Sequence, residues 1–330
     1  MTRVLMTADA VGGVWTYAVE LADALARHGV ATTIATMGRA PSPAQRAAAA
    51  AHDLRESTFA LEWTDDPWRD VDAAGEWLLG LAAEVRPDVV HLNGYAHAAL
   101  PWPAPVVVVA HSDVLSWFRA VRGTEAPAEW DEYRRRLARG LDAAGALVAP
   151  TRAVLDGMGR DGVVIPNARS ASWVRAVPKE PFVLAAGRAW DEAKNVAALR
   201  RVALPWPLVV AEDRPFAEVA GLLCRAAVFA HPARYEPFGL ASLEAGLAGC
   251  ALVLGDVPSL REVWGDAAVY ADPADDAALA ALLGSLAEDP AAVRDLGARA
   301  RARALTYSPE RQAVAYLAVY AGLAGARGAA

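Results

Sequence analysis

The stretch Arg3-Val-Leu-Met-Thr-Ala-Asp9, followed by Ala-Val-Gly12-Gly13 and later by Ala31-Thr-Thr-Ile-Ala-Thr36, decides the fold. Within it, Arg3–Thr7 and Ala31–Thr36 are short apolar runs of the kind that form buried strands of a parallel sheet. Between them, apolar residues recur at helical spacing, and Gly29 is placed to end the helix. The residues with that spacing are Val14, Tyr17, Ala18, Leu21 and Leu25. The stretch therefore predicts a strand–helix–strand unit.

The same alternation continues along the chain. Further apolar runs predict strands at 88–92, 106–110 and 146–149, and then at 182–186, 208–211, 228–230, 251–254 and 268–270. The segment 166–181 is polar and carries three prolines, so it marks a domain boundary. We expect two α/β domains facing a cleft, over residues 1–168 and 169–307. A last helix, 308–330, begins at Ser308-Pro309, a good N-cap followed by proline.

Composition narrows the class of protein. A chain of 330 residues that is 55% hydrophobic can bury two cores. Its formal net charge of −7 argues against nucleic acid as a partner, because phosphates demand basic surfaces. The apolar runs are too short to cross a bilayer, and the first residues lack a signal peptide's features, so we expect a cytoplasmic protein without integral membrane contact. Cys224 and Cys250 sit among apolar neighbours, which favours buried reduced thiols over a disulfide or metal site.

The segment Glu236-Pro-Phe-Gly-Leu-Ala-Ser-Leu-Glu244 is the most informative about function. Its Pro-Phe-Gly turn leads into apolar residues at helical spacing, which describes a loop that becomes a helix with free backbone amides at its start. Such a helix start suits a phosphate. Glu236 lies before these amides and Glu244 lies two turns into the helix, so carboxylates flank the anion site and can accept from sugar hydroxyls. A phosphate with polyols on either side is a nucleotide sugar.

This motif resembles the Glu-x(7)-Glu signature of the retaining nucleotide-sugar glycosyltransferases with the GT-B fold, those similar to glycosyltransferase family 4. Other segments resemble that family in the same order: Asp9–Thr16, Val106–His111, Val164–Asn167, Gly187-Arg188, Lys194-Asn195 and Gly255–Glu262. The resemblance spans residues 3 to 320. It implies two Rossmann-like parallel-sheet domains facing a central cleft, with a C-terminal helix that crosses back to the first domain.

The resemblance also implies roles for single residues. The donor-binding set is Gly12, Gly13, Arg188, Lys194, Glu236, Pro237, Phe238, Gly239, Leu240 and Glu244, and the catalytic set is His111, Arg188, Lys194 and Glu236. In the resembled family the two cations meet the diphosphate, the first Glu holds the donor sugar and the second holds the ribose. Taken alone, Gly12-Gly13 also fits a tight turn, His111 a core histidine, and the two cations solvated surface.

Candidates for the acceptor side lie in the first domain, which binds the acceptor in GT-B enzymes. They are Asp9 before the glycine loop, Asn93 and Tyr95 after one strand, and Trp117 in a polar stretch. A leaving diphosphate needs positive charge nearby, and here basic side chains and helix amides can supply it. We therefore expect no metal, and no cofactor beyond the nucleotide diphosphate sugar that serves as donor. Ligand clusters with zinc spacing are absent from the sequence.

The chain departs from the family between Lys194 and Glu236, where only 41 residues intervene. The family usually has further elements there, including a loop that faces the nucleobase, so UDP, GDP and ADP sugars all remain open as donors. The function predicted is a retaining, metal-independent glycosyltransferase that moves a hexose to a hydroxyl of a small molecule or glycan. Two alternatives remain: a catalytically degenerate GT-B domain that binds a nucleotide or partner, and another GT-B enzyme such as an epimerase or phosphorylase.

Overall fold

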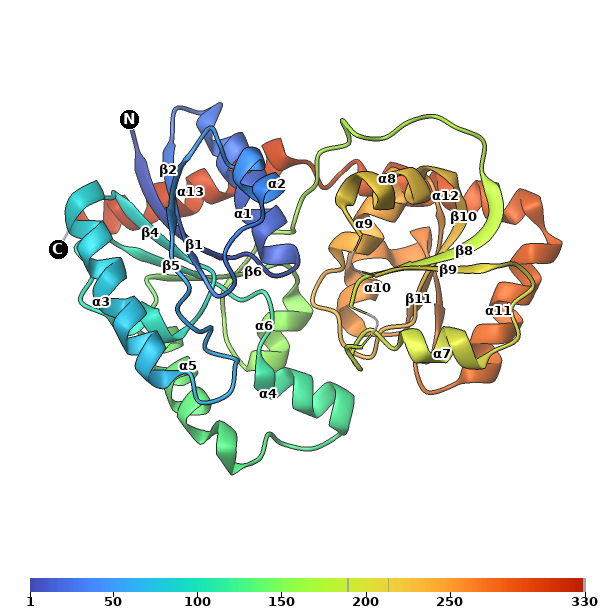
Figure 1. Cartoon of the computed structure of the whole chain (residues 1–330), viewed down its shortest axis with the longest axis horizontal. Coiled ribbons are helices and arrows are strands. Elements are labelled where there is room, and N and C mark those ends of the chain that lie inside the picture. The colour runs from blue at the N-terminus through green and yellow to red at the C-terminus, as the bar shows by residue number, and fades with distance from the viewer. Residues whose placement is uncertain (189, 213, 329–330) are drawn as a thin grey trace.

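A computed structural model of the chain describes residues 1–188, 190–212 and 214–328. The first half forms a seven-stranded sheet in the order β3-β2-β1-β4-β5-β6-β7, and each neighbouring pair is parallel (Figure 1). Its strands are β1 (Arg3–Asp9), β2 (Ala31–Met37), β3 (Asp53–Glu56), β4 (Val89–Leu92), β5 (Val106–Val109), β6 (Ala146–Ala149) and β7 (Val163–Val164). The longer helices of this half are α1 (Gly13–Ala26), α3 (Trp68–Val85) and α5 (Asp131–Ala143); the shorter ones are α2 (Pro43–Ala48), α4 (Val114–Trp117), α6 (Arg152–Met158), η1 (Ala96–Ala99), η2 (Phe118–Arg122) and η3 (Ala128–Trp130).

The second half forms a five-stranded parallel sheet in the order β12-β11-β10-β8-β9. Its strands are β8 (Glu180–Ala186), β9 (Leu208–Ala211), β10 (Ala226–His231), β11 (Ala251–Gly255) and β12 (Val269–Ala271). Its helices are α7 (Val196–Arg201), α8 (Phe216–Arg225), α9 (Leu240–Leu247), α10 (Pro258–Trp264), η4 (Gly265–Ala267), α11 (Asp276–Glu288) and α12 (Pro290–Ala304). The predicted pair of parallel-sheet α/β domains is confirmed. In its described residues, the short segment before Glu236 holds α7, β9, α8 and β10 and no further element, and β9 lies at the edge of the sheet.

Every strand predicted from an apolar run is present, with ends that differ by two residues at most. The two strands that the sequence did not predict are β3 and β7, which lie at opposite edges of the first sheet. Edge strands need only one buried face and tolerate polar residues, so β3, with the sequence Asp-Leu-Arg-Glu, lacks an apolar run. Cys224 and Cys250 are buried free thiols, as expected, and burial raises the pKa of Cys250 to about 11.

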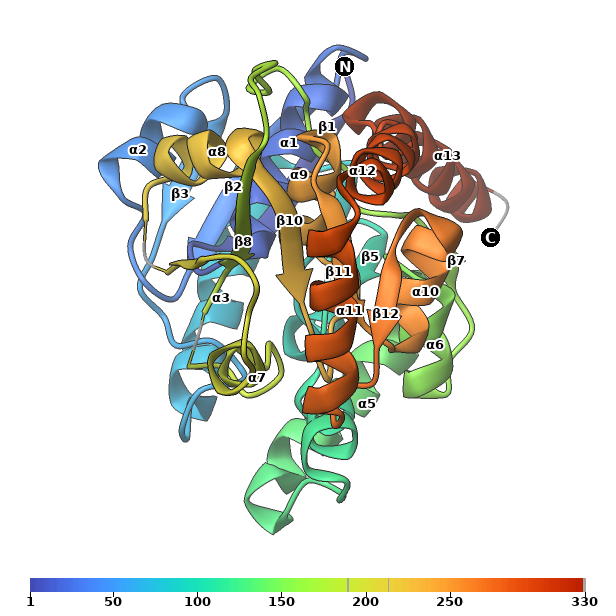
Figure 2. The ribbon, with the colours of Figure 1, turned by 90° about the vertical axis from the view of Figure 1, so that its right-hand side faces the viewer.

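Helix α13 (Pro309–Gly328) starts at the predicted position and crosses back to the first sheet. Figure 1 shows it behind β1 and β2, and Figure 2 shows it leaving the second half beside α12. Its Tyr316 and Tyr320 are buried in the same core as α1 and the strands of the first sheet. In the described part of the chain, none of the helices combines the length and the apolar character needed to cross a membrane.

A chain of buried polar side chains fixes α13 to the first sheet. The Tyr17 hydroxyl donates to the Tyr316 hydroxyl at 2.6 Å and accepts from His91 Nε2 at 3.1 Å. The Tyr320 hydroxyl lies 2.7 Å from His91 Nδ1, to which it donates. This pattern requires a neutral imidazole with its proton on Nε2. Burial accordingly lowers the pKa of His91 to about 3, and the nearby His111 adds to the effect.

We predict that His91 makes the fold sensitive to acid. Its pKa is lower in the folded chain than the ordinary 6.5, so the unfolded chain binds the proton more tightly. Its contribution is therefore complete above pH 6.5 and is lost as the pH falls toward 3. Between pH 7 and pH 5 we expect the free energy of unfolding to fall by about 2 kcal/mol more in the wild type than in His91→Gln. Urea denaturation at both pH values measures this difference, and equal losses in the two proteins would contradict the prediction.

Candidate active site between the two sheets

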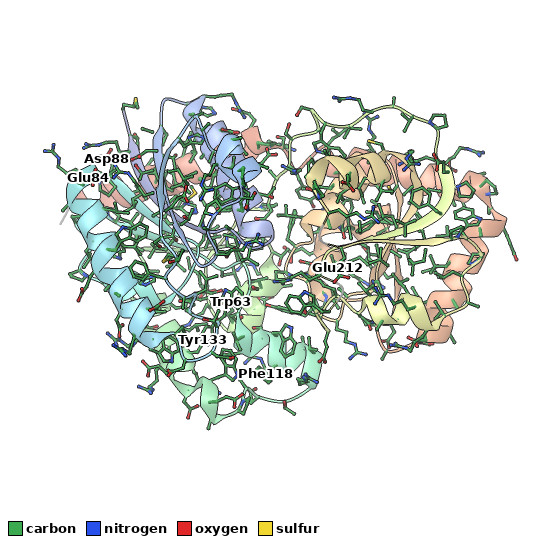
Figure 3. All side chains as sticks on the ribbon, in the orientation of Figure 1. Trp63, Glu84, Asp88, Phe118, Tyr133 and Glu212 are labelled. Carbon is green, nitrogen blue, oxygen red and sulfur yellow. The ribbon has the colours of Figure 1, made fainter. Side chains whose placement is uncertain are left out.

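Ligands of open α/β sheets bind outside the carboxyl ends of the strands, and here the two sets of strand ends face each other. The hydroxyl of Thr151, which follows β6, donates to the carbonyl of Pro237 at 3.0 Å. Trp63 from the first half and Glu212 from the end of β9 lie on the facing sides (Figure 3). The predicted site residues can therefore meet across this junction even though they lie far apart in sequence.

The glycine loop of the first domain touches the start of α9. Gly12 precedes α1 with a φ of 78° and a ψ of −143°, a conformation that side chains rarely tolerate. A β-carbon added at Gly13 would lie 3.0 Å from Leu240 Cδ1. The structure thus brings together Gly12-Gly13 and the Glu236–Glu244 motif, the two segments that the sequence analysis assigned to donor binding.

The start of α9 is built to leave its amides free. Gly239 occupies the cap position with a φ of 90°, and among the described residues no side chain caps the helix. The Phe238 amide just before it donates to Glu236 Oε1 at 3.5 Å. Phe238 is buried beneath it, and the Ser259 hydroxyl donates to the Glu236 carbonyl, which holds the preceding turn. Uncapped N–H groups at a helix start bind anions well.

Glu236 forms a cluster with two basic side chains. Its Oε2 lies 2.7 Å from Lys194 Nζ and 3.1 Å from His231 Nε2, and its side chain is only 12% exposed. Burial alone would raise the pKa of this carboxyl, but the Lys194 charge and the His231 hydrogen bond outweigh it and hold the pKa well below its usual range. His231 was not predicted, although its place at the carboxyl end of β10 is the position that drew attention to His111.

Arg188 reaches toward the first domain from the end of β8. Its Nη2 donates to Asp191 at 3.0 Å, its guanidinium lies over the Trp190 ring at 5.3 Å, and its side chain is 41% exposed. Burial raises the pKa of Asp9, on the first domain, to about 6, while the Val11 amide and the Arg188 charge oppose the rise. In the described residues no group of three His, Cys, Asp or Glu is placed to hold a metal ion.

Glu244 takes part in an ion-pair chain that joins the two domains. Arg169, in the segment between the sheets, donates through Nε to Glu244 at 2.8 Å and through Nη1 to Glu20 of α1 at 2.6 Å. Burial raises the pKa of Glu244, although Arg169 opposes the rise. The sequence did not predict that Arg169 and Glu20 belong to this site. The role of Glu244 toward a ribose stays a prediction.

His111 is held in a defined orientation at the end of β5. Asn93 donates through Nδ2 to the Thr7 carbonyl at 2.6 Å, so its Oδ1 accepts from His111 Nε2 at 2.8 Å. The ring of Tyr17 meets the imidazole edge-on, with ring centres 4.5 Å apart. Burial lowers the pKa of His111 to about 4, so the imidazole is neutral at physiological pH.

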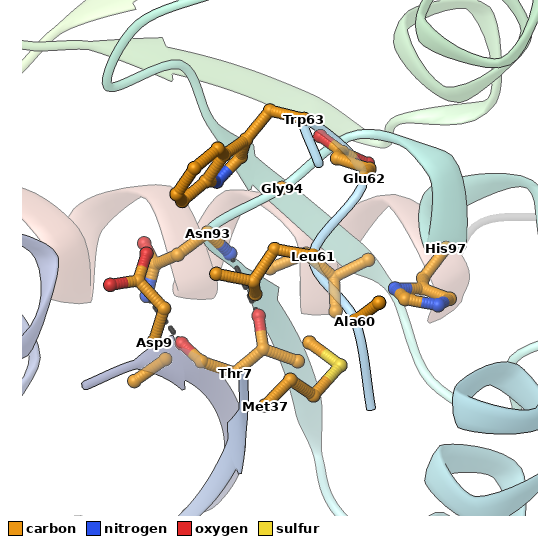
Figure 4. Close-up of a pocket in the computed structure, with 12 residues that line it drawn as sticks. Thr7, Asp9, Met37, Ala60, Leu61, Glu62, Trp63, Asn93, Gly94 and His97 are labelled. Atoms are coloured by element: carbon orange, nitrogen blue, oxygen red, sulfur yellow. Dashed lines mark hydrogen bonds between the residues drawn. The ribbon is translucent and has the colours of Figure 1, made fainter. Parts of the chain in front are cut away.

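A small cavity opens beside Asp9 and Asn93 (Figure 4). It holds about 50 Å³ and is lined by Thr7, Ala8, Asp9, Met37, Ala60, Leu61, Glu62, Trp63, Leu92, Asn93, Gly94 and His97. Two of the four acceptor-side candidates therefore line one cavity, together with Glu62 and Trp63, which the sequence did not single out. The other two lie elsewhere: Tyr95 is buried with its hydroxyl on the Ser112 carbonyl, and Trp117 packs against Phe118.

The loop that leads to Glu236 depends on a glycine. A β-carbon added at Gly255, the end of β11, would lie 2.1 Å from the Ala233 carbonyl oxygen, so the loop would have to move. We expect Gly255→Ala to lower the free energy of unfolding by about 1–3 kcal/mol and to weaken any activity that depends on Glu236. Gly284→Ala is the matched control, because its β-carbon would meet nothing within 4 Å in α11. Equal unfolding midpoints for the two variants would contradict the prediction.

Comparison with known proteins agrees with this geometry. Residues 11–180 match the model of the family Glycosyltransferase Family 4, and residues 213–303 match that of Glycosyl transferases group 1. The fold is that of a GT-B glycosyltransferase. The chain belongs to glycosyltransferase family 4.

The curated relatives match over limited stretches. Glycogen synthase of Mycobacterium tuberculosis is 41% identical over 113 residues, which is 34% of this chain and 27% of that protein. O-antigen chain mannosyltransferase B of Escherichia coli is 46% identical over 79 residues, 24% of this chain and 19% of that protein. The matches thus span about a quarter or less of the length of these relatives.

Solved structures match over nearly the whole chain. Sucrose-phosphate synthase from Thermosynechococcus elongatus superimposes with a TM-score of 0.79 at 18% identity and covers 99% of this chain and 100% of its own. The Anabaena protein HepE, solved in complex with UDP and glucose, gives a TM-score of 0.75 at 15% identity, with 98% and 100% covered. At these identities the likeness establishes the GT-B fold.

Proposed function

We propose that the protein transfers a hexose from a nucleoside diphosphate sugar to a hydroxyl group, with retention of anomeric configuration and without a metal ion. The observation that carries the proposal is the Lys194–Glu236–His231 cluster, which lies beside the uncapped start of α9. Leu240, in the first turn of that helix, lies against Gly13 of the glycine loop. Among structural neighbours, HepE was solved with UDP and glucose, which supports a sugar nucleotide as donor. In this proposal residues 1–168 form the acceptor side, 169–307 the donor side, and 308–330 the helix that returns.

In the reaction proposed, the bond between the anomeric carbon and the phosphate oxygen breaks, and its electron pair leaves with the diphosphate. The acceptor oxygen forms its bond to the same carbon from the same face, and its proton passes to the departing phosphate. Arg188, Lys194 and the amides of Phe238, Gly239 and Leu240 meet the negative charge that develops on the leaving group. Fixed charges aimed at a leaving group contribute most where water is excluded.

The carboxylates in this proposal bind hydroxyls rather than transfer protons. The Lys194 charge keeps Glu236 ionised, so it accepts from the donor sugar, with Pro237 shaping the turn behind it. Glu244 presents one oxygen to Arg169 and offers the other to the ribose. His111 is neutral and donates to Asn93, so it orients the sugar beside Gly12 and Gly13 and does not act as an acid.

The experiment that tests the proposal has two stages. Thermal unfolding is measured first with UDP, GDP and ADP, since a ligand at 100 times its Kd adds about 2.7 kcal/mol of stability. Glu244→Gln serves as the matched variant, because it removes charge but keeps the size of the side chain. We expect one nucleotide to raise the Tm of the wild type by several degrees and to raise that of the variant by less.

The second stage measures release of that nucleotide from its glucose and mannose diphosphate sugars. Cleavage of a donor supports the proposal, and strict dependence on added inorganic phosphate would identify a phosphorylase instead. A nucleotide that binds while no donor is cleaved with any acceptor would favour a binding module. That outcome would agree with the shortened second sheet, in which β9 is an edge strand.

A further inference from the structure

The cavity beside Asp9 has a chemical character that bears on the acceptor. It lies in the first domain next to the carboxyl ends of β1 and β4, and its wall includes Asp9 and Asn93. Asn93 holds His111, which the proposed function places beside the donor sugar. A group that occupies this cavity is therefore close to the atoms that react.

One wall of the cavity is an exposed indole. Trp63 is 43% exposed and is among the few large apolar side chains of the described chain that solvent reaches to this extent. Figure 4 shows its ring standing above Asn93 and Gly94, on the same side of the cavity as Glu62. A flat aromatic face next to polar groups suits the C–H face of a sugar ring, because tryptophan offers a large apolar surface at a wet site.

Two carboxyl groups line the cavity, and burial raises the pKa of both, that of Asp9 to about 6. Its charged lining residues are Asp9 and Glu62, and no Lys or Arg is among the residues that line it. The Glu62 carboxylate accepts from the amides of Tyr95 and Ala96 at 2.7–3.2 Å, which fixes it in place. Arg39 of the first domain donates to the Ala10 carbonyl at 3.3 Å. The Arg188 charge of the second domain acts on Asp9 and opposes the rise in its pKa, and the proposed function assigns that charge to the donor diphosphate. Fixed carboxylates accept from hydroxyls and repel phosphate.

The size of the cavity limits what enters. About 50 Å³ is room for a few groups the size of water. The hydroxyls along one edge of a sugar fit this space, while the ring stays outside against the indole.

We propose that this cavity takes one edge of an unphosphorylated sugar, with hydroxyls directed at Asp9 and Glu62 and the ring against Trp63. The acceptor is then a neutral saccharide rather than a sugar phosphate. This inference rests on the proposed function, because it identifies the acceptor of the same reaction.

Matched acceptor pairs test the proposal: glucose with glucose 6-phosphate, mannose with mannose 6-phosphate, and fructose with fructose 6-phosphate. Each is supplied with the donor whose nucleotide raises the Tm, and both free nucleotide and glycoside product are measured. We expect kcat/KM for the neutral member of an accepted pair to exceed that for its phosphate by at least tenfold. Preference for the phosphorylated member would overturn the proposal.

Two variants place the effect in the cavity. Trp63→Ala should raise the KM for the neutral acceptor by about tenfold with little change in the KM for the donor, and Trp63→Phe should recover most of the loss. Asp9→Asn should reduce the preference for the neutral over the phosphorylated acceptor, because it removes a repelling charge; a merely structural role would not change that ratio. Asp65→Asn, an exposed carboxylate of the same loop, is the matched control and should change neither quantity.

The outcomes separate this inference from the proposed function. Neutral acceptors that are used equally well by the wild type, Trp63→Ala and Asp9→Asn would overturn the assignment of the cavity. Donor cleavage without transfer to any of the six sugars would overturn the acceptor class and leave the proposed function standing. Absence of both nucleotide binding and donor cleavage would overturn the proposed function and this inference with it.

Discussion

Replacing Arg188 by alanine is expected to lower kcat by about 10²–10³, because removal of one fixed group that meets charge in the transition state has an effect of that size. Donor affinity should fall much less, since the charge on the leaving phosphate develops as the bond breaks. The Arg188 side chain is 41% exposed and pairs with Asp191, which is 11% exposed, so the unfolding midpoint has to be measured beside the kinetics. Steady-state kinetics with the identified donor, together with the unfolding midpoint, measure both quantities.

The controls for this prediction come from the same domain. Arg261→Ala removes an exposed arginine that pairs with Asp256 and should leave turnover unchanged. Arg188→Lys keeps the positive charge but cannot form the bidentate hydrogen bonds of a guanidinium, so this variant should retain part of the activity. Equal losses of nucleotide affinity and turnover in Arg188→Ala would contradict a role confined to the transition state.

Lys194→Met is expected to lower the free energy of unfolding by about 3 kcal/mol, because it leaves the Glu236 carboxylate buried without its charged partner. His231 Nε2 remains within 3.1 Å of the Glu236 carboxylate. Methionine is similar in length to lysine, so most of the lost stability should come from the missing charge rather than from poorer packing. Denaturant unfolding of the two single variants and of Lys194→Met/Glu236→Gln measures the coupling, and the double variant should be more stable than Lys194→Met alone.

The pH dependence gives a second readout of this pair. The pKa of Glu236 is lower in the folded chain than its ordinary value of 4.5, so the pair's contribution is present above pH 4.5 and is lost as the pH falls below it. The stability difference between the wild type and Lys194→Met should therefore shrink on acidification from pH 7 to pH 3. A difference that stayed constant over this range would show that the loss arises from packing.

The strands could be predicted because a strand buried on both faces needs a run of apolar residues, and every run predicted as a strand forms one. The edge strands β3 and β7 were not predicted, because they are only partly buried and lack a long run of apolar residues. The site residues that were foreseen follow strand ends directly, as Asp9 follows β1 and His111 follows β5. The end of a strand can be predicted from the sequence, and in a parallel sheet the carboxyl ends of neighbouring strands lie at the same edge.

The residues that sequence reasoning missed depend on contacts across the fold. Glu62 and Trp63 lie in an irregular segment between β3 and α3, and only the path of that loop places them beside Asn93. Arg169 reaches both Glu20 and Glu244, a relation that exists only once the two domains have been brought together. Periodicity carries no information about such contacts, because it describes one element at a time.

The hydrogen bond between Tyr17 and Tyr316 joins residues 299 positions apart. Ribosomes add about 5–20 residues per second, so roughly 15–60 s separate the emergence of these two partners. Through that interval the second domain can complete its own core, while the first lacks the helix that covers one face of its sheet. The first domain to be synthesised is therefore the last to finish folding. Until α13 has been synthesised, the uncovered face of its sheet in the nascent chain must be kept from associating with other molecules.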